Sequence, residues 1–287
     1  MPNNLDNFAV MIESHGRPNM PSYKSLRKQG YTGRIIVLID NEDKTAPEYK
    51  KLYGDEVVVF DKIEMSKVVD TCDNFDDRRA VVYARNYSYI LAKELGLKYF
   101  LQIDDDYNKW DYRRDEEGFY GYKMVWNLDK VFDSYINFSK NVPANMCAMA
   151  QGGDYIGGKD NGSYSVLKLH RKVMNTFFCT TSQELAWKGR MNDDVNTYLY
   201  YGIKGVLFLT TPNTSITQIE TQNAAGGMTD IYLSMGTYVK SFYSVIIAPA
   251  FVKVAFMGQK HRRLHHRVSW NNAVPVILSE RHKKYEN

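Results

Sequence analysis

Three consecutive aspartates, Asp104, Asp105 and Asp106, are the residues whose type and spacing point most directly to chemistry. They follow a short apolar run, Tyr99 to Ile103, that is typical of a buried parallel strand. Because alternate residues of an extended chain project to the same side, Asp104 and Asp106 can share one cation. Carboxylate oxygens suit Mg²⁺ or Mn²⁺, which take their other ligands from water and a substrate phosphate. A solvated acidic turn after a strand is the alternative explanation.

Strands and helices alternate before the triplet, and together they must form the sheet that positions it. Three apolar segments are expected to be strands, over residues 8–12, 34–39 and 56–60. Helices are expected over residues 23–29, 49–53 and 79–95. This alternation predicts an α/β fold with a mostly parallel, Rossmann-type sheet that has helices on both faces. Such sheets bind ligands beyond the carboxyl ends of their strands, where the triplet lies.

Two further residues fit a nucleotide site. Asp40, at the end of the second predicted strand, is placed to hydrogen-bond a ribose hydroxyl or a base. The sequence contains neither Gly-x-Gly-x-x-Gly nor a Walker A motif, which disfavours dinucleotide oxidoreductases and P-loop enzymes. A diphosphate would therefore need other neutralising groups, such as Arg85 and a metal on Asp104 and Asp106. A solvated helix charge is the alternative for Arg85.

Composition sets broad limits. Hydrophobic content of 44% and charged content of 24% are ordinary for a globular chain, and 287 residues are enough for a large core. The net charge of +4 is compatible with a polyanionic partner but too small to argue for one. Three scattered cysteines and the lack of a signal-peptide pattern predict a reducing, cytoplasmic location. Pro249 and Lys253 interrupt the longest apolar stretch, so no membrane span is expected.

The chain after the triplet is expected either to extend one large α/β domain or to add a lobe to it. A charged, aromatic loop is expected over residues 110–118. Helices are expected over residues 128–139, 195–201 and 232–243, and strands over 146–150, 204–209 and 273–278. A glycine-rich stretch, residues 151–158, permits close backbone approach to a ligand or forms a flexible hairpin.

The order of these motifs resembles that of a known family. Ser14-His-Gly-Arg-Pro18, Asp40, Arg85-Asn86 and Ile103-Asp-Asp-Asp-Tyr107 are similar to the motif order of GT-A glycosyltransferases, whose Asp-x-Asp motif binds the metal of a sugar nucleotide. The closer resemblance is to the TET-associated glycosyltransferase group, known from bacteriophages and from fusions in some eukaryotic proteins. It covers roughly residues 8–270.

This resemblance implies a GT-A-like fold and a division of labour along the chain. We expect a single glycosyltransferase domain over residues 1–287, with a nucleotide-sugar-binding half over about 5–110. An acceptor half that completes the active site is expected over about 111–270, and residues 280–287 are expected to be a tail.

The resemblance also implies the donor side of the site. The donor would be a UDP-sugar, and the cofactor Mn²⁺ or Mg²⁺ held by Asp104, Asp106 and a late histidine, His265 or His266. The residues implied to bind the donor are Ser14, His15, Arg17, Asp40, Arg85, Asp104, Asp105, Arg262 and Arg263.

The late histidines lie in a dense basic segment, residues 260–270, which has two compatible interpretations. It can be a patch that binds nucleic-acid phosphates. By the resemblance, it can instead bring a histidine to the metal, and Arg262, Arg263 and Arg267 to the leaving diphosphate. A solvated tail is a third explanation.

On the acceptor side, the region around Asp193 and Asp194 resembles the x-Glu-Asp region of GT-A enzymes. Asp194 is the implied general base, with Asp193 beside it, and takes the proton from an acceptor hydroxyl that attacks the anomeric carbon. This geometry implies inversion, and helix capping is the alternative role for both acids. The remaining acceptor-binding candidates are Tyr107, Trp110 and Tyr155 as stacking rings, and Gly226, Gly227 and Thr229 from a further group signature.

The expected function is therefore metal-dependent transfer of a sugar from a UDP-sugar to a modified pyrimidine in DNA. The group resemblance implies a 5-hydroxymethyl- or 5-hydroxy-pyrimidine, for example hydroxymethylcytosine, which the enzyme would flip out of a duplex or reach by bending it. It also implies a cytoplasmic location, in the host if the chain is phage-encoded. A GT-A enzyme that acts on protein or glycan and a non-catalytic nucleic-acid-binding module both stay open.

Overall fold

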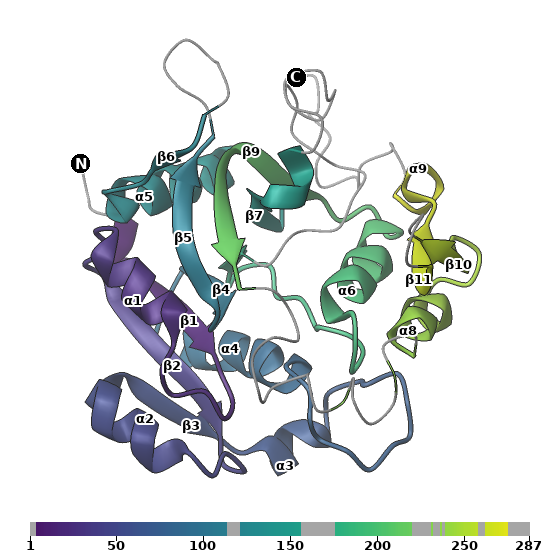
Figure 1. Ribbon diagram of the computed structural model, residues 1–287, viewed down its shortest axis with the longest axis horizontal. Coiled ribbons are helices and arrows are strands. Elements are labelled where there is room, and N and C mark those ends of the chain that lie inside the picture. The colour runs from purple at the N-terminus through teal and green to yellow at the C-terminus, as the bar shows by residue number, and fades with distance from the viewer. Residues whose placement is uncertain are drawn as a thin grey trace.

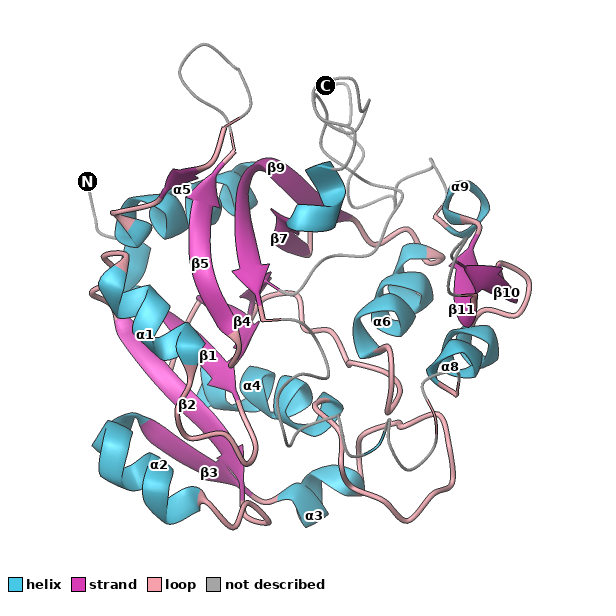
Figure 2. Ribbon diagram, in the orientation of Figure 1, coloured by secondary structure: helices cyan, strands magenta, loops and turns pink. Residues whose placement is uncertain are grey.

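The computed structural model describes residues 4–113, 121–155, 176–219, 231, 236, 239–257 and 262–274. These residues are organised around a nine-stranded sheet with strand order β3-β2-β1-β4-β8-β7-β9-β5-β6 (Figures 1 and 2). A second, two-stranded sheet, β10-β11, lies in a small lobe beside α6. Short 3-10 helices occupy Asn4–Asn7, Gly54–Glu56 and Gly152–Tyr155.

The first part of the sheet is parallel. Its strands are β1 (Phe8–Glu13), β2 (Arg34–Asp40), β3 (Val57–Phe60) and β4 (Tyr99–Asp104). Its helices are α1 (Pro21–Lys28), α2 (Ala46–Tyr53), α3 (Lys62–Ser66) and α4 (Val82–Glu94). Strand β1 pairs in parallel with both β2 and β4, so the loops after these strands meet at one edge. The predicted order of strands is confirmed here, and α3 is an additional helix that the sequence did not predict.

Burial explains why β1 lies in the centre. All six of its residues are buried, as expected for a strand covered on both faces. Phe8, Val10 and Ile12 pack in the core that α1, α2 and α5 cover, whereas Ala9 and Met11 pack in the core that α4 and α6 cover. Each large apolar side chain that is buried in this way contributes roughly 1.5–3 kcal/mol.

The second part of the sheet is mixed. Its strands are β5 (Tyr107–Tyr112), β6 (Lys123–Met124), β7 (Met146–Gln151), β8 (Thr176–Thr180) and β9 (Phe208–Gln218), and its helices are α5 (Leu128–Asn141) and α6 (Asp193–Gly202). Strand β8 joins the halves because it pairs antiparallel with both β4 and β7. Strand β9 then pairs in parallel with β7 and antiparallel with β5. The predicted α/β fold, a large sheet flanked by helices, is confirmed.

The prediction of a loop over residues 110–118 is wrong at its start. Its start belongs to β5, and the Trp110 side chain is only 1% exposed. Gln29, at the end of α1, explains this: its side-chain amide donates to the carbonyl oxygen of Trp110 at 2.7 Å and accepts from the Trp110 amide at 2.9 Å. The charged neighbours of Trp110 made the segment look solvated, whereas this long-range amide contact holds it in the sheet.

Another correction concerns the strand expected over residues 204–209. The structure starts this strand, β9, at Phe208 and continues it through Pro212 to Gln218. Its pairing with β7 shifts register between Met149 and Ala150, so the ladder is irregular beside the proline. The proline lacks an amide proton and normally marks the end or an irregularity of a strand, which concealed the length of β9.

The small lobe contains α8 (Lys240–Ile247), β10 (Val252–Met257), β11 (Arg263–Val268) and α9 (Trp270–Ala273). An apolar cluster of Val195, Leu199, Ala248, Val252 and Ala273 joins it to α6. A helix was expected over residues 232–243, and its described part begins at Lys240. A strand was expected to begin at Ala273, but this residue is the last one of α9. None of the described helices has the length and apolar character needed to cross a bilayer.

Candidate active site at the carboxyl edge of the sheet

The aspartate triplet forms the turn between β4 and β5. Asp104 is the last residue of β4, and Asp105 and Asp106 make the turn. Ser22, at the start of α1, holds this turn in place. Its hydroxyl donates to the Asp104 carbonyl oxygen at 2.7 Å and accepts from the Tyr107 amide at 2.7 Å, and its own amide donates to the Asp105 carbonyl oxygen at 3.2 Å. The backbone of the triplet is therefore fixed by α1.

The Asp105 carboxylate differs from those of Asp104 and Asp106 because it is bound by residues of the first loop. Arg17 Nη2 lies 2.8 Å from Asp105 Oδ1, and the Ser14 hydroxyl donates to Oδ2 at 2.5 Å. Burial raises the pKa of Asp105 to about 6, with a smaller contribution from Asp104, although Arg17 and Ser14 oppose this. Asp105 therefore anchors the first loop and leaves Asp104 and Asp106 as the candidate cation ligands.

The Asp106 carboxylate is only partly satisfied. Its Oδ2 accepts from Gln218 Nε2 at 3.1 Å, whereas its Oδ1 is buried without a hydrogen-bond partner. Burial, followed by the charge of Asp104, raises the pKa of Asp106 to about 7. A buried carboxylate oxygen that lacks a donor and lies beside another carboxylate fits a divalent cation, which would compensate both charges.

A complete protein ligand set is not formed by the described residues. No three His, Cys, Asp or Glu side chains gather there into a group that holds a metal alone. His265 Nδ1 lies 2.8 Å from the His266 carbonyl oxygen, and His266 Nδ1 lies 3.2 Å from Asn192 Nδ2. The predicted convergence of a late histidine with Asp104 and Asp106 is thus absent from this part of the structure. The two carboxylates would take their cation's other ligands from phosphate and water.

Arg85 lies beneath the triplet and connects it to α6. Its Nη2 lies 3.0 Å from Asp104 Oδ1, and its Nε lies 2.8 Å from Asp193 Oδ2 and 3.6 Å from Glu13 Oε2. The guanidinium also packs over the rings of Phe177 and Trp187. Because Arg85 is 4% exposed, its charge serves these carboxylates and is not open to a diphosphate in this structure.

Glu13 is a member of this cluster that the sequence did not reveal. It ends β1 and pairs in register with Asp104 on β4. Burial, with added repulsion from Asp104 and Asp193, raises the pKa of Glu13 to about 8, although Arg85 opposes this. The sequence signal that could have identified Glu13 is its position as an acidic residue at the end of a fully apolar strand.

The amino end of α6 supplies the second pair of acids. Asp193 and Asp194 are its first two residues, and Asn192, which precedes them, has a left-handed φ of 55°. Burial, followed by Asp194 and Asp104, raises the pKa of Asp193 to about 6, while Arg85 opposes this. Asp194 is half-buried, and its Oδ1 accepts from the Val195 amide at 2.8 Å. Asp193, rather than Asp194, is therefore the acid in direct contact with the Arg85 cluster.

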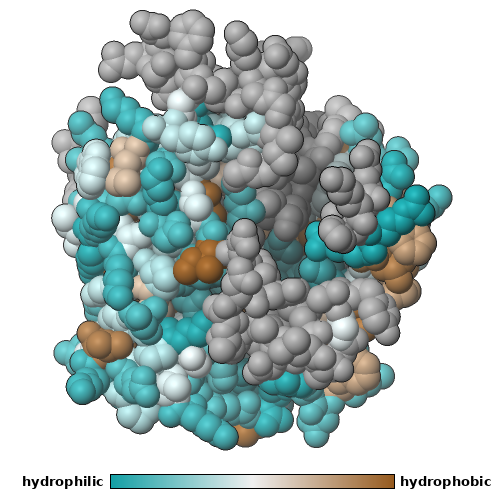
Figure 3. Space-filling view, in the orientation of Figure 1, coloured by the Kyte–Doolittle hydropathy of each residue, from teal (hydrophilic) through white to brown (hydrophobic). Residues whose placement is uncertain are grey.

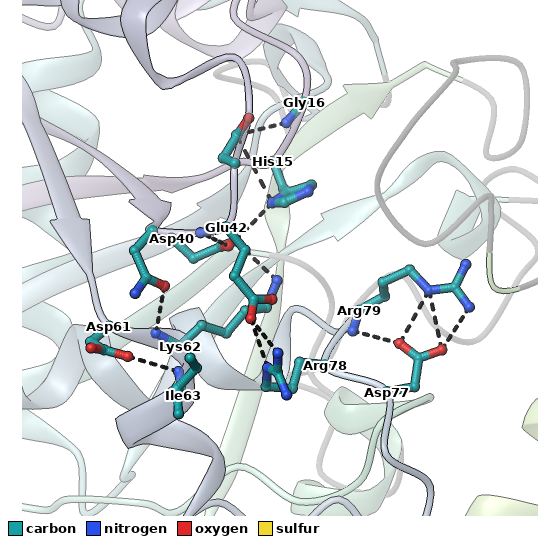
Figure 4. Close-up of polar contacts among 12 residues, drawn as sticks. His15, Gly16, Asp40, Glu42, Asp61, Lys62, Ile63, Asp77, Arg78 and Arg79 are labelled. Carbon is teal, nitrogen blue, oxygen red and sulfur yellow. Dashed lines mark hydrogen bonds and ion pairs between the residues drawn. The ribbon is translucent and has the colours of Figure 1, made fainter.

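The loop after β1 gathers the predicted donor-side residues. Ser14 and Arg17 reach Asp105, as described, while His15 Nδ1 lies 2.7 Å from Asp40 Oδ2. Lys62 Nζ lies 3.1 Å from the same Asp40 oxygen (Figure 4). Although burial opposes it, the His15 hydrogen bond and the Lys62 charge lower the pKa of Asp40. Lys62 was not expected from the sequence, and its place at the start of α3 became visible only in the fold.

A profile of the TET-associated glycosyltransferases matches residues 8–227 of this chain. The chain belongs to this family. The match includes the triplet, Arg85, Asp193 and Asp194, and ends before the lobe of α8 to α9. The protein is therefore a glycosyltransferase, as the sequence predicted.

Solved structures resemble this TET-associated glycosyltransferase more distantly. The crystal structure of glucosyl-3-phosphoglycerate synthase from Mycobacterium tuberculosis, in complex with Mn²⁺, UDP and phosphoglyceric acid, is 9% identical. The comparison covers 94% of this chain and 88% of that one, with a TM-score of 0.47. The crystal structure of a mycobacterial protein is 8% identical, covers 91% and 84% of the two chains, and has a TM-score of 0.46. No curated protein matches the sequence.

The aromatic residues expected at the acceptor side of this glycosyltransferase are buried. Tyr107 is 0% exposed, Trp110 1% and Tyr155 7%. The Trp110 indole donates to the Ser25 hydroxyl at 3.2 Å, and the Tyr155 hydroxyl donates to the Pro212 carbonyl oxygen at 2.7 Å. The structure thus gives their rings packing roles and almost no surface on which a base can stack. Gly226, Gly227 and Thr229 lie outside the described residues.

The three arginines expected at the diphosphate, Arg262, Arg263 and Arg267, are exposed; Arg262 directly precedes β11, and the other two lie on it. They belong to the lobe beside α6, whereas Arg17 lies at the triplet itself. Arg17 is therefore the predicted donor-side arginine that the structure brings to the carboxylates from the first loop.

Proposed function

We propose that this glycosyltransferase moves a sugar from a UDP-sugar to a hydroxyl group on a 5-hydroxymethyl- or 5-hydroxy-pyrimidine in DNA. We propose that the reaction uses Mn²⁺ or Mg²⁺ and inverts the anomeric carbon. The observation that carries the proposal is the cluster of Glu13, Asp104, Asp106 and Asp193, which has one buried arginine among four carboxylates. The family match supports sugar transfer, and the family's TET association supports the DNA acceptor.

The donor would bind between the first loop and the triplet. His15 and Asp40 are paired at the end of β2, where a nucleoside fits a parallel sheet. Asp104 and Asp106 would hold the cation, which when bound supplies positive charge to the diphosphate. Arg17 is partly exposed beside Asp105, and its remaining donors can add charge-assisted hydrogen bonds to phosphate oxygens.

The acceptor would approach the amino end of α6. Its hydroxyl oxygen forms a bond to the anomeric carbon while the bond to the diphosphate oxygen breaks, and the diphosphate leaves with that electron pair. Asp194 takes the hydroxyl proton because it is half-buried and therefore accessible. Asp193, buried and paired with Arg85, positions the helix terminus relative to the triplet.

We propose that the chain works as one unit with a donor half and an acceptor half. One sheet contains strands from both parts, and the expected boundary near residue 110 falls inside β5. Donor and acceptor residues therefore share a continuous hydrogen-bonded framework.

Nucleoside mass spectrometry tests this function. The enzyme is incubated with Mn²⁺, a panel of UDP-sugars and DNA that contains hydroxymethylated, hydroxylated or unmodified pyrimidines. A mass gain of one sugar on a modified base, lost in Asp104→Ala and Asp106→Ala but kept in the exposed control Glu48→Ala, is expected. Slow release of UDP without a gain on any DNA would contradict the DNA acceptor and move it to protein or glycan.

A further inference from the structure

The net positive charge of the protein comes from one segment near its end that contains no acidic residue. From Ile231 to Ser279 the sequence contains no Asp or Glu but six Lys or Arg residues. Because the whole chain has a net charge of +4, the remainder carries a net charge of −2. A charge distribution this uneven produces a local positive potential that the net charge conceals.

The β10-β11 hairpin displays part of this charge on one face. Lys253 on β10 pairs in register with Arg267 on β11, and Met257 pairs with Arg263. Arg263 and Arg267 are four residues apart, so they share a face of the strand with Lys253. All three cations are exposed. Hydrophilic side chains lie beside a hydrophobic patch at this edge of the molecule (Figure 3). We call Lys253, Arg263 and Arg267 the basic face.

The basic face is not neutralised by the part of the chain that the structure describes. None of its three members forms an ion pair with a carboxylate there. Lys253 and Arg267 lie directly opposite each other, an arrangement of like charges that destabilises a strand pair. A cost of this kind without internal compensation indicates an anionic partner.

The opposite side of the hairpin connects to the site. Val252 of β10 packs with Val195 and Leu199 of α6. His266 Nδ1 contacts Asn192, the residue before Asp193. The hairpin is thus attached to α6, the helix whose amino end carries the acceptor-side acids, and the basic face lies on the side of the hairpin turned away from that helix.

We propose that the basic face binds the phosphodiester backbone of the acceptor DNA and so holds the duplex on the lobe that is attached to α6. This proposal rests on the proposed function, because it assumes a DNA acceptor. Exposed cations that share one face of the hairpin can contact successive phosphates of a DNA strand without reading the sequence. It differs from the diphosphate interpretation of Arg262, Arg263 and Arg267, because all three side chains are exposed, whereas the ion pairs of the triplet within the described residues come from Arg17 and Arg85.

Binding of an unmodified DNA duplex, measured by fluorescence anisotropy at 50–300 mM salt, tests the proposal without requiring catalysis. The test variant is Lys253→Gln/Arg263→Gln/Arg267→Gln. The matched control is Lys28→Gln/Lys50→Gln/Lys51→Gln, which removes three exposed cations of α1 and α2 from the other side of the molecule. UDP binding in the presence of Mn²⁺ is measured for both variants by calorimetry.

We expect the hairpin variant to bind DNA roughly 100-fold more weakly at 0.1 M salt. The slope of log K against log salt should become shallower by about 2.7, because each phosphate contact contributes about 0.9. The slope of the control variant should differ from the wild-type slope by no more than about 0.9, the contribution of one phosphate contact. UDP binding should be unchanged in both variants.

Three results would overturn the proposal and separate it from the proposed function. Equal DNA affinity in the two variants would remove the basic face as the DNA-binding surface but leave the transfer reaction intact. Loss of UDP binding in the hairpin variant would assign these cations to the diphosphate. Wild-type protein that binds UDP with Mn²⁺ but no DNA would contradict both the basic face and the DNA acceptor.

Discussion

Two groups of carboxylates lie at the same edge of the sheet but are compensated in different ways. In the first loop, Asp40 has His15 and Lys62, and Asp105 has Arg17. In the central cluster, Glu13, Asp104 and Asp193 share Arg85, and Asp106 Oδ1 has no hydrogen-bond partner. The protein neutralises the first group itself. The central cluster has more carboxylates than the one arginine can neutralise. A bound cation would supply the missing positive charge.

The largest expected effect follows removal of the shared cation. Arg85→Met should lower the free energy of unfolding by about 3–5 kcal/mol, because it leaves buried carboxylates unpaired. Urea denaturation measures this change. Arg85→Lys keeps the positive charge but lacks the several donors of the guanidinium group, so its free energy of unfolding should fall by less than that of Arg85→Met. A loss below about 1 kcal/mol in Arg85→Met would show that the cluster does not depend on this ion pair.

The next effect separates stability from activity within the triplet. Asp106→Asn should reduce sugar transfer on the order of 100-fold or more, because it removes a proposed cation ligand. Its free energy of unfolding at pH 7 should be unchanged or higher, since a poorly compensated buried acid is lost. Activity assays and denaturation of the same preparation give both values. An Asp106→Asn protein with full activity would contradict the cation role.

Asp105→Asn supplies the contrast to that variant, because Asp105 is already paired with Arg17 and Ser14. Mn²⁺ with UDP at about 100 times the dissociation constant should stabilise the wild type by about 2.7 kcal/mol. Asp105→Asn should be less stable but retain most of this gain, whereas Asp106→Asn should lose it. Thermal melts with and without Mn²⁺ and UDP measure the difference, and equal gains in the two variants would refute it.

The smallest effect is a pH dependence in the first loop. The hydrogen bond to Asp40 raises the pKa of His15 above its ordinary value of 6.5, although burial opposes this. Protonated His15 therefore adds stability that is fully present below pH 6.5 and is lost as the pH rises through the folded pKa. His15→Gln should flatten this part of the stability profile between pH 5 and 9. Because the His15 side chain is 40% exposed, the change should be small, and an identical profile in both proteins would exclude the pair as its source.

The difference between the two groups also separates what the sequence could and could not predict. Local patterns sufficed for the α/β fold, for the strand that ends at Asp104 and for the helix that begins at Asp193, because each depends on apolar periodicity and on polar residues at an element's end. The partners of Arg85 did not follow from any local pattern. They come from β1, β4 and α6, which are far apart in the chain and meet only through sheet pairing.

Trp110 and Asp111 are a second case in which the local sequence did not predict the structure. Both are buried in β5, although the surrounding charges are typical of a solvated loop. Asp111 Oδ1 lies 3.0 Å from Lys109 Nζ, and Gln29 supplies the backbone contacts of Trp110. A strand held by a helix that is about eighty residues distant has no signature within its own sequence.

The tie between Ser22 and the triplet has a consequence for binding kinetics. Three hydrogen bonds from one residue of α1 fix the turn that carries Asp104 and Asp106 before any ligand arrives. The conformational entropy of that turn is therefore lost during folding and not during substrate association. A preorganised turn of this kind needs no induced rearrangement, so the rate of cation capture should be governed by dehydration of the ion rather than by motion of the protein.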